Sequence, residues 1–96
     1  MIASFGDKAT EALFHGVDGK EVRRIPRDIH RVARRKLDQL NAAAELRDLR
    51  SPPGNRLEAL KGDRKGLHSV RINDRWRVTF KWEAGEAQQV KIEDYH

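Results

Sequence analysis

Positively charged side chains recur at alternating positions in the second half of the chain. Those that share this spacing are Arg71, Arg75, Arg77 and Lys81. Because side chains two positions apart lie on one face of a β-strand, the spacing predicts a row of cations on one side of a small sheet. Lys61 and Arg64 precede the row in a Lys-Gly-Asp-Arg turn. Such a surface is suited to binding a polyanion, although alternating charges are also typical of an exposed strand that avoids edge-to-edge association.

The last three residues, Asp94, Tyr95 and His96, carry side chains that are suited to proton transfer. Imidazole titrates near neutral pH, and a neighbouring carboxylate orients it and favours its protonated form. By period-two spacing, Tyr95 shares the face of the cations, where its ring is suited to stacking or to a hydrogen bond with a phosphate. A chain end is also often frayed and without function, so the residues alone leave both interpretations open.

A three-stranded antiparallel meander is expected to position these side chains. The apolar positions of its middle strand alternate with the cations and are Trp76, Val78, Phe80 and Trp82. Shorter alternating runs lie at residues 70–72 and 90–92. Asn73-Asp74 and residues 84–86 separate the three runs and predict turns. One face of the meander is therefore expected to pack a core while the other carries the cations.

Two helices are predicted before the meander. Asp7 is a suitable N-cap for a helix from Lys8 to about His15, and Pro26 is suited to the first turn of a longer helix that extends to about Leu46 or Leu49. The apolar positions expected to face the core are Ile29, Val32, Ala33, Leu37, Leu40 and Ala44, with Ala43 as a further candidate. The opposite, polar face of this helix carries Arg27, Arg31, Arg34, Arg35 and Lys36.

Residues 2–5 are read as a short edge strand, so the predicted order is strand, helix, helix and three strands. This order predicts an α+β fold in which an N-terminal strand and two helices accompany a small antiparallel sheet, with both helices packed on one face. A chain of 96 residues is long enough for a single domain, expected to span residues 1–96.

The composition bounds the class of protein. Lys and Arg number 20 and Asp and Glu number 15, which leaves a net charge of +5 and favours a polyanionic partner. The chain has no cysteine, which excludes disulfides and thiolate metal sites. No apolar run approaches the roughly 18 residues of a membrane span. We therefore expect a soluble, cytoplasmic protein.

Three stretches of the chain together resemble the HigB-like branch of the RelE/ParE toxin superfamily. Residues 47–64 contain Ser-Pro-Pro-Gly-Asn-Arg-Leu followed by Leu-Lys-Gly-Asp-Arg, residues 73–80 read Asn-Asp-Arg-Trp-Arg-Val-Thr-Phe, and the chain closes with Glu-Asp-Tyr-His. The opening Met-Ile-Ala-Ser-Phe fits the same branch, so the resemblance covers essentially the whole chain. It implies a RelE-like fold and a toxin of a bacterial toxin–antitoxin pair, also described as a plasmid maintenance killer protein.

The resemblance further implies a ribosome-dependent endoribonuclease that cuts messenger RNA in the decoding site. RNA cleavage without a metal uses the neighbouring 2′-hydroxyl as nucleophile and needs a base, cations for the developing charge and an acid for the leaving oxygen. The implied partners are the ribosome with its mRNA and a HigA-like helix-turn-helix antitoxin. Operator DNA is expected to be bound only by the complex with this antitoxin. We expect no cofactor and no metal ion.

By position in the family pattern, the resemblance implies that Lys61, Arg71 and Arg77 bind the scissile phosphate. Some members of this branch carry histidine, read as the catalytic base, where this chain has Glu58, so the base stays open among Glu58, Asp94 and His96. The expected catalytic residues are Glu58, Lys61, Arg77, Asp94, Tyr95 and His96. The expected RNA-binding residues are Arg64, Arg71, Arg75 and Lys81.

Two other functions stay open on the sequence alone. A ParE-like toxin, which poisons gyrase and cuts no RNA, shares the same fold, and fold does not separate the two. A non-catalytic basic module that binds RNA, or represses transcription with its partner, is the third interpretation. The arginine-rich face of the longer helix is suited to ribosomal RNA, to an acidic antitoxin segment or simply to solvent.

Overall fold

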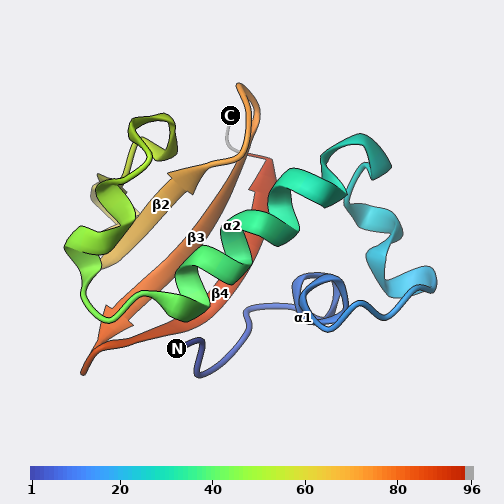
Figure 1. The fold of residues 1–96 in the computed structure, drawn as a ribbon, viewed down its shortest axis with the longest axis horizontal. Coiled ribbons are helices and arrows are strands. Elements are labelled where there is room, and N and C mark those ends of the chain that lie inside the picture. The colour runs from blue at the N-terminus through green and yellow to red at the C-terminus, as the bar shows by residue number, and fades with distance from the viewer. Residues whose placement is uncertain (95–96) are drawn as a thin grey trace.

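The computed structural model describes residues 1–94 of the chain as a helical layer and one antiparallel sheet (Figure 1). The helices and strands are α1 (Lys8–Phe14), α2 (His30–Ala42), β1 (Glu58–Ala59), β2 (Leu67–Arg71), β3 (Trp76–Glu83) and β4 (Glu86–Asp94). The strands pair in the order β1-β2-β3-β4. Helix α2 lies across one face of the sheet, and α1 packs against α2 and β4. This arrangement confirms the predicted α+β fold and the meander of its last three strands.

The core lies between α2 and the sheet. Ala33, Leu37 and Leu40 form one stripe of α2 by their i, i+4, i+7 spacing, and all three are fully buried. They pack in one cluster with Val78 and Phe80 of β3. The period of two in β3 therefore does what the sequence predicts, since its apolar residues face α2 and leave the other face of the sheet for polar side chains.

The outer edge of β4 is covered by the N-terminal segment rather than by a true strand. The expected edge strand at residues 2–5 is wrong in this respect, because Ile2 and Phe5 form only isolated parallel bridges, to Ala87 and Val90. Between these bridges Gln89 has a left-handed backbone with a φ of 55°. That irregularity interrupts a regular ladder of backbone hydrogen bonds between the two segments. The Gln89 N–H instead donates to the Ser4 hydroxyl at 2.9 Å.

Farther along the same edge, side chains from the helical layer satisfy the backbone of Ile92. Its N–H donates to Thr10 Oγ1 at 2.9 Å, and its carbonyl accepts from Arg24 Nη2 at 2.7 Å. Thr10 belongs to α1, whose N-cap Asp7 accepts the Thr10 N–H at 3.0 Å as the sequence predicts. These contacts join α1 to the end of β4 and leave no open sheet edge at that point.

We expect Thr10→Val to lower the free energy of unfolding by about 1–3 kcal/mol, because the buried Ile92 N–H loses its acceptor. Ser4→Ala is the matched control, since it removes an exposed hydroxyl that accepts a bond of the same length on the same edge. Water can replace that hydroxyl, so the control is expected to cost less than about 0.5 kcal/mol. Urea denaturation followed by circular dichroism measures the free energy of unfolding of both variants. Equal values for the two would contradict the role that is assigned to burial of the Ile92 N–H.

The longer helix differs from the prediction at both ends and on one face. Pro26 is followed by a 3-10 turn at Arg27–Ile29, and α2 then ends at Ala42, not at Leu46 or Leu49. It ends there because Ala43 has an extended backbone, with ψ of 129°. A capping box formed by Glu45 and Asp48 then begins a separate 3-10 turn.

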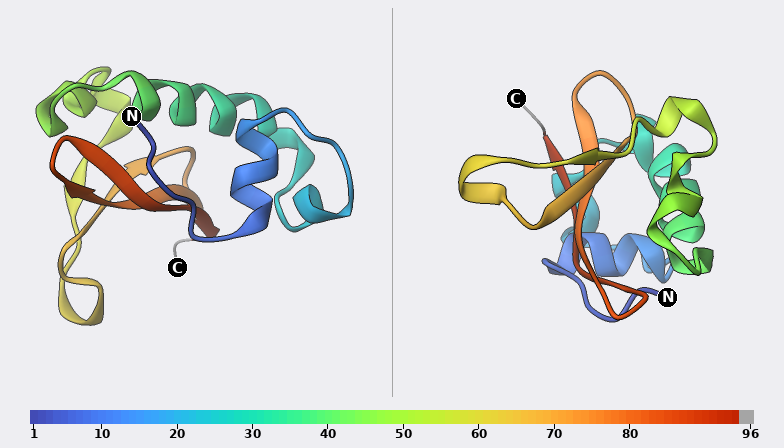
Figure 2. Two further views of the ribbon diagram at one scale, coloured as in Figure 1. Left: turned by 90° about the horizontal axis from the view of Figure 1, so that it is seen from below. Right: turned by 90° about the vertical axis from the view of Figure 1, so that its left-hand side faces the viewer.

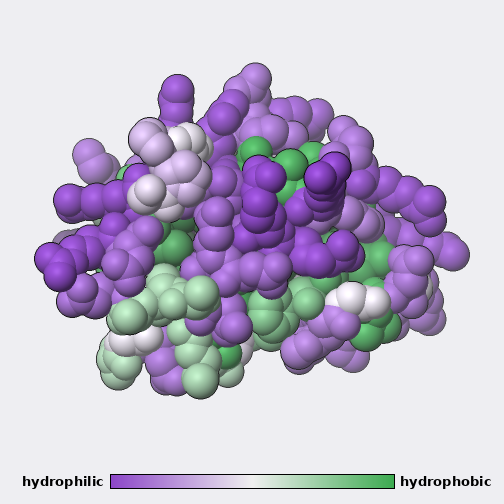
Figure 3. Space-filling view, in the orientation of Figure 1, coloured by the Kyte–Doolittle hydropathy of each residue, from purple (hydrophilic) through white to green (hydrophobic). Residues whose placement is uncertain are grey.

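Two burial predictions for this region are also wrong. Ala44 is exposed, while Ala43 is buried, because the chain leaves the helix one residue earlier. Lys36, expected on the polar face, is only 6% exposed because the loop before β1 lies over it and supplies Asn55 as its partner. Arg27, Arg31, Arg34 and Arg35 are exposed as predicted. Seen from the α2 side, the surface is mainly hydrophilic, with smaller apolar patches between the charged side chains (Figure 3).

No helix within residues 1–94 combines the length and apolar composition of a membrane-spanning segment.

Candidate active site

The sheet face opposite α2 carries three of the residues that the sequence singles out, Glu58, Arg71 and Arg77. Strand register sets Arg71, Arg77 and Glu93 directly opposite one another on β2, β3 and β4, which places them on one face. The next row on that face consists of Glu58, Ser69, Thr79 and Lys91. The loop between β1 and β2, which contains Lys61 and Arg64, extends from the sheet on the side away from α2 (Figure 2).

Arg77 is the middle residue of its row, between Arg71 and Glu93, but it is not the solvent-exposed cation that the alternation predicts. Its exposed fraction is only 9%, because the loop before β1 covers it. Its Nη2 donates to the carbonyl of Arg56 at 2.6 Å, and its Nη1 lies 4.0 Å from Oε2 of Glu58. A guanidinium that is held in this way has a defined direction, which is what binding of a phosphate oxygen requires.

Glu93 is a member of this face that sequence reasoning missed. Its carboxylate accepts hydrogen bonds from Arg64 Nη2 and from the hydroxyl of Thr79. Burial alone would raise the pKa of Glu93, but the hydrogen bonds from Arg64 and Thr79, together with the charges of Arg64 and Lys91, hold that pKa below its ordinary value. The Arg64–Glu93 pair therefore ties the loop between β1 and β2 to β4.

Because the pKa of Glu93 is lowered by folding, its stabilising contribution is present above the unfolded-state pKa and is lost as the pH falls through the folded-state pKa. We expect Glu93→Gln to be less stable than the wild type at neutral pH, and the difference to shrink on acidification from about pH 5 to about pH 3. Denaturation of both proteins across this pH range measures the difference between their free energies of unfolding. Glu11→Gln, at an exposed position of α1, serves as the control, and a difference that does not change with pH would contradict the assignment.

The other arginines of the predicted row are held by carboxylates at one end of the sheet. Arg71 pairs with Asp74 in the turn between β2 and β3. Arg75 precedes β3 and pairs with Asp94 at 2.5 Å. Asp94 itself lies opposite Trp76 in the register, so it belongs to the face of the apolar residues and not to the face of Arg77. These pairs gather the cations and the last described residue at the end of the sheet where Arg77 lies.

The remaining predicted site residues are placed differently. Lys61 is exposed at the start of the 3-10 turn Gly62–Arg64. Lys81 is exposed and pairs with Glu83 at 3.0 Å, and its position four residues along β3 separates it from Arg77 by roughly 13 Å. The structure therefore does not bring Lys81 close to Arg77. Tyr95 and His96 lie outside the described residues.

A cleft of about 520 Å³ opens on this same face, between the N-terminal segment and the loop that carries Arg64. Its polar lining consists of Arg64, Thr79, Gln89, Lys91 and Glu93, and Phe5, Gly6 and Leu67 complete it. The cleft adjoins the row of Arg77 through Glu93, which is opposite Arg77 in the register. It is large enough for a nucleotide-sized ligand.

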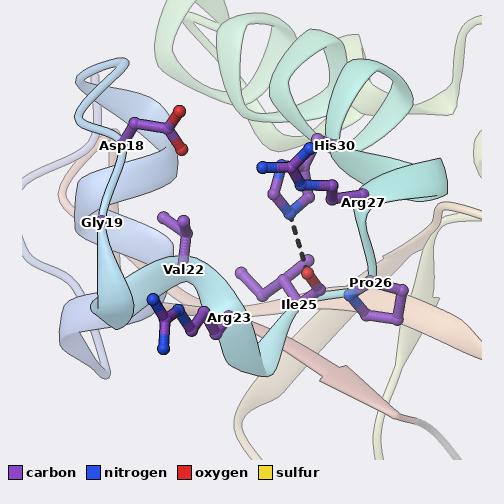
Figure 4. A pocket seen from close by; sticks show the side chains of 8 residues that line it. All are labelled: Asp18, Gly19, Val22, Arg23, Ile25, Pro26, Arg27 and His30. Atoms are coloured by element: carbon purple, nitrogen blue, oxygen red, sulfur yellow. Dashed lines mark hydrogen bonds between the residues drawn. The ribbon is translucent and has the colours of Figure 1, made fainter.

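A second cavity, of about 480 Å³, lies where the 3-10 turn Lys20–Arg24 meets the start of α2 (Figure 4). Val22, Ile25 and Pro26 form its apolar part, and Arg23 and Arg27 also line it. The ring of His30 is oriented by a bond of 2.8 Å between its Nε2 and the carbonyl of Ile25. None of the residues that line this cavity belongs to the sheet, so it is separate from the face of Arg77.

Comparison with known proteins identifies relatives along the whole chain. The family model described as "RelE-like toxin of type II toxin-antitoxin system HigB" matches residues 3–96. A Vibrio cholerae serotype O1 protein, "Toxin HigB-1", is 40% identical over 95 residues that cover 99% of this chain and 98% of the relative. A Proteus vulgaris protein, "Endoribonuclease HigB", is 34% identical over 101 residues that cover all of both chains.

A Haemophilus influenzae protein of uncharacterized function is 35% identical over 72 residues, which cover 75% of this chain and 71% of the relative. Together with the family model, these relatives confirm the resemblance that the three sequence stretches indicate. The chain belongs to the HigB-like toxins, the RelE-like toxins of type II toxin–antitoxin systems.

Proposed function

We propose that this protein is a ribosome-dependent endoribonuclease that acts in the cytoplasm, and that the face of Arg77 is its active site. The observation that carries the proposal is the placement of Arg77, which is nearly buried, held by a backbone carbonyl and within 4.0 Å of the Glu58 carboxylate. The name of the Proteus vulgaris relative, "Endoribonuclease HigB", supports the same reaction class.

The reaction proposed for this site is attack of a ribose 2′-hydroxyl on the adjacent phosphate. The 2′-oxygen forms a bond to phosphorus as the bond from phosphorus to the 5′-oxygen breaks, which yields a 2′,3′-cyclic phosphate and a 5′-hydroxyl. A base takes the 2′-hydroxyl proton, cations stabilise the dianionic phosphorane, and an acid protonates the leaving oxygen. These steps need no metal ion.

Of the two open candidates that lie within the described residues, Glu58 and Asp94, we propose Glu58 as the base. Its carboxylate lies beside the Arg77 guanidinium, so a phosphate bound by Arg77 would have its ribose within reach. Asp94 is engaged by Arg75 at 2.5 Å and follows the opposite row of the sheet, which makes it a better orienting group than a base. His96, with its imidazole, is assigned the role of acid, and Tyr95 and Lys61 are assigned contacts to the phosphate.

The mRNA strand is proposed to continue from Arg77 into the cleft beside Glu93. Arg64 and Lys91 supply cations along that path, and the cleft has the size of a nucleotide. Single-stranded RNA is commonly bound by such a positively charged groove. Arg71 and Arg75 lie at the same end of the sheet as Arg77, and we propose that they contact the strand on the side of the cut away from the cleft.

Membership in a type II toxin–antitoxin family implies an antitoxin partner. We infer that this partner is a HigA-like helix-turn-helix protein and that operator DNA is contacted only through the complex. The ribosome is proposed as the second partner, with the exposed arginines of α2 contacting ribosomal RNA by sequence-independent, salt-sensitive binding.

Induced expression followed by mapping of mRNA ends tests the proposal. Cuts that appear only in translated messages, and that disappear when translation initiation is blocked, are the expected result. Intact messages with broken DNA would instead favour gyrase poisoning. Growth arrest without cleavage of either nucleic acid would favour a non-catalytic module. Co-expression of the antitoxin, as the control, is expected to abolish both arrest and cleavage.

A further inference from the structure

A lysine and an asparagine form a buried polar pair between α2 and the loop that precedes β1. Lys36 is 6% exposed and Asn55 is fully buried, and Nζ of Lys36 donates to Oδ1 of Asn55 at 2.5 Å. Burial, reinforced by the nearby Arg35 charge, lowers the pKa of Lys36. An apolar residue would fill this position of the helix without the free-energy cost of burying a charged group. The buried polar pair therefore needs a functional explanation.

The side-chain amide of Asn55 fixes the loop on which it lies. Its Nδ2 donates to the carbonyl of Leu49 at 3.1 Å and to that of Ser51 at 3.2 Å. With Oδ1 occupied by Lys36, the amide nitrogen and oxygen both have partners. The Asn55 N–H also donates to the carbonyl of Pro52 at 2.9 Å. The side chain and backbone of Asn55 therefore have one orientation relative to α2.

The fixed position of Asn55 constrains the next residue, Arg56, which contacts Arg77. Arg56 has a left-handed backbone with a φ of 45°, a conformation that residues other than glycine adopt only when their surroundings hold them there. Its N–H donates to the carbonyl of Pro53 at 3.1 Å. As a result its own carbonyl points at Arg77 and accepts Nη2 at 2.6 Å.

We propose that Lys36 and Asn55 are positioning residues for the active site: they hold the Arg56 carbonyl, which in turn orients the Arg77 guanidinium beside Glu58. Neither side chain touches the RNA. The catalytic meaning of this chain of contacts depends on the proposed function, whereas the orientation of Arg77 does not. A small displacement of a catalytic group lowers the rate steeply, so the pair acts on kcat more than on binding.

Two variants test the proposal. Lys36→Met keeps the length of the side chain and removes its donor and charge, and Asn55→Asp keeps the shape and the acceptor while removing the Nδ2 donors. Lys8→Met, the same change at an exposed lysine of α1, is the matched control. Thr10→Val serves as a second control, because its expected destabilisation arises at the β4 edge of the sheet, the edge opposite β1 and the loop that holds Asn55.

The first readout is the kcat and KM of translation-coupled mRNA cleavage. We expect kcat to fall about 10- to 100-fold in Lys36→Met and Asn55→Asp, with KM for the ribosome within about threefold of the wild type. Lys8→Met and Thr10→Val are expected to keep the wild-type kcat. Loss of kcat in Thr10→Val equal to that in Lys36→Met would overturn the proposal, since stability alone would then explain both.

The second readout is the ¹⁵N NMR signal of the Arg77 guanidinium, measured in the protein without ribosomes. Separate, slowly exchanging Nη signals are expected in the wild type and in Lys8→Met, and averaged, shifted signals in Lys36→Met and Asn55→Asp. Unchanged Arg77 signals in both variants would overturn the proposal whatever the activity. If the wild type cuts no mRNA but the Arg77 signals respond as expected, the proposed function fails and the positioning role stands.

Discussion

The Arg77→Ala variant is expected to cut translated mRNA about 10²- to 10³-fold more slowly than the wild type, the usual loss when a preorganised group that stabilises developing charge is removed. The expectation follows from the placement of this guanidinium, which is almost buried and already bound to the Arg56 carbonyl. Such a group does not need to be ordered when the transition state forms. Cleavage in a reconstituted translation system, quenched over a time course, measures the rate.

Arg77→Lys sharpens the test. Lysine keeps the charge but offers no planar fork of donors, so it cannot bond the Arg56 carbonyl and a phosphate in the same geometry. We expect it to recover no more than about one tenth of the lost rate. Arg23→Ala, at an exposed arginine of the turn Lys20–Arg24, controls for the loss of positive charge. Full cutting by a folded Arg77→Ala protein would refute the assignment of this face as the active site.

The second large effect is expected from the proton-transfer residues. Removal of a general acid or base typically costs about 10²- to 10⁴-fold in rate, and we expect His96→Ala to fall in this range. The pH–rate profile distinguishes this loss from a structural one. The wild type is expected to lose rate above the pKa of its acid, and the variant to lack that alkaline limb.

Glu58→Gln gives the complementary profile. If Glu58 is the base, its replacement is expected to remove the acidic limb while the alkaline limb of His96 stays. A His96→Ala protein that cuts at the wild-type rate would exclude the imidazole as the acid, and retention of both limbs in Glu58→Gln would move the base to Asp94 or His96. Near-wild-type unfolding of both variants is the required control, and it is expected for Glu58→Gln because Glu58 is exposed.

Local sequence patterns were sufficient for much of the fold. The period of two from Trp76 to Trp82 identified β3 and its apolar face, and Asp7 identified the start of α1, because both depend on neighbours within a few residues. The end of α2 was harder to predict. Residues 43–49 continue an apolar helical spacing, while the capping box of Glu45 and Asp48 competes for the same backbone and prevails.

The candidate site divides in the same way. Alternation alone placed Arg71 and Arg77 on the face opposite the core, but it predicted an exposed Arg77. Burial of Arg77 depends on the loop around Arg56, which lies 21 residues earlier in the chain. Glu93 was missed for a related reason, since its partnership with Arg64 spans 29 residues and no local period reveals it.

What the sequence determined by itself was therefore the two helices, the three-stranded meander, the sidedness of β3 and the family. What only the tertiary structure decided was the register that sets Arg71, Arg77 and Glu93 in one row, and the buried contact of Lys36 with Asn55. The physical reason is the range of the forces involved. Backbone periodicity is set by adjacent residues, whereas register and burial depend on which distant segments pack together, and a polar side chain is buried only where such a segment supplies its partner.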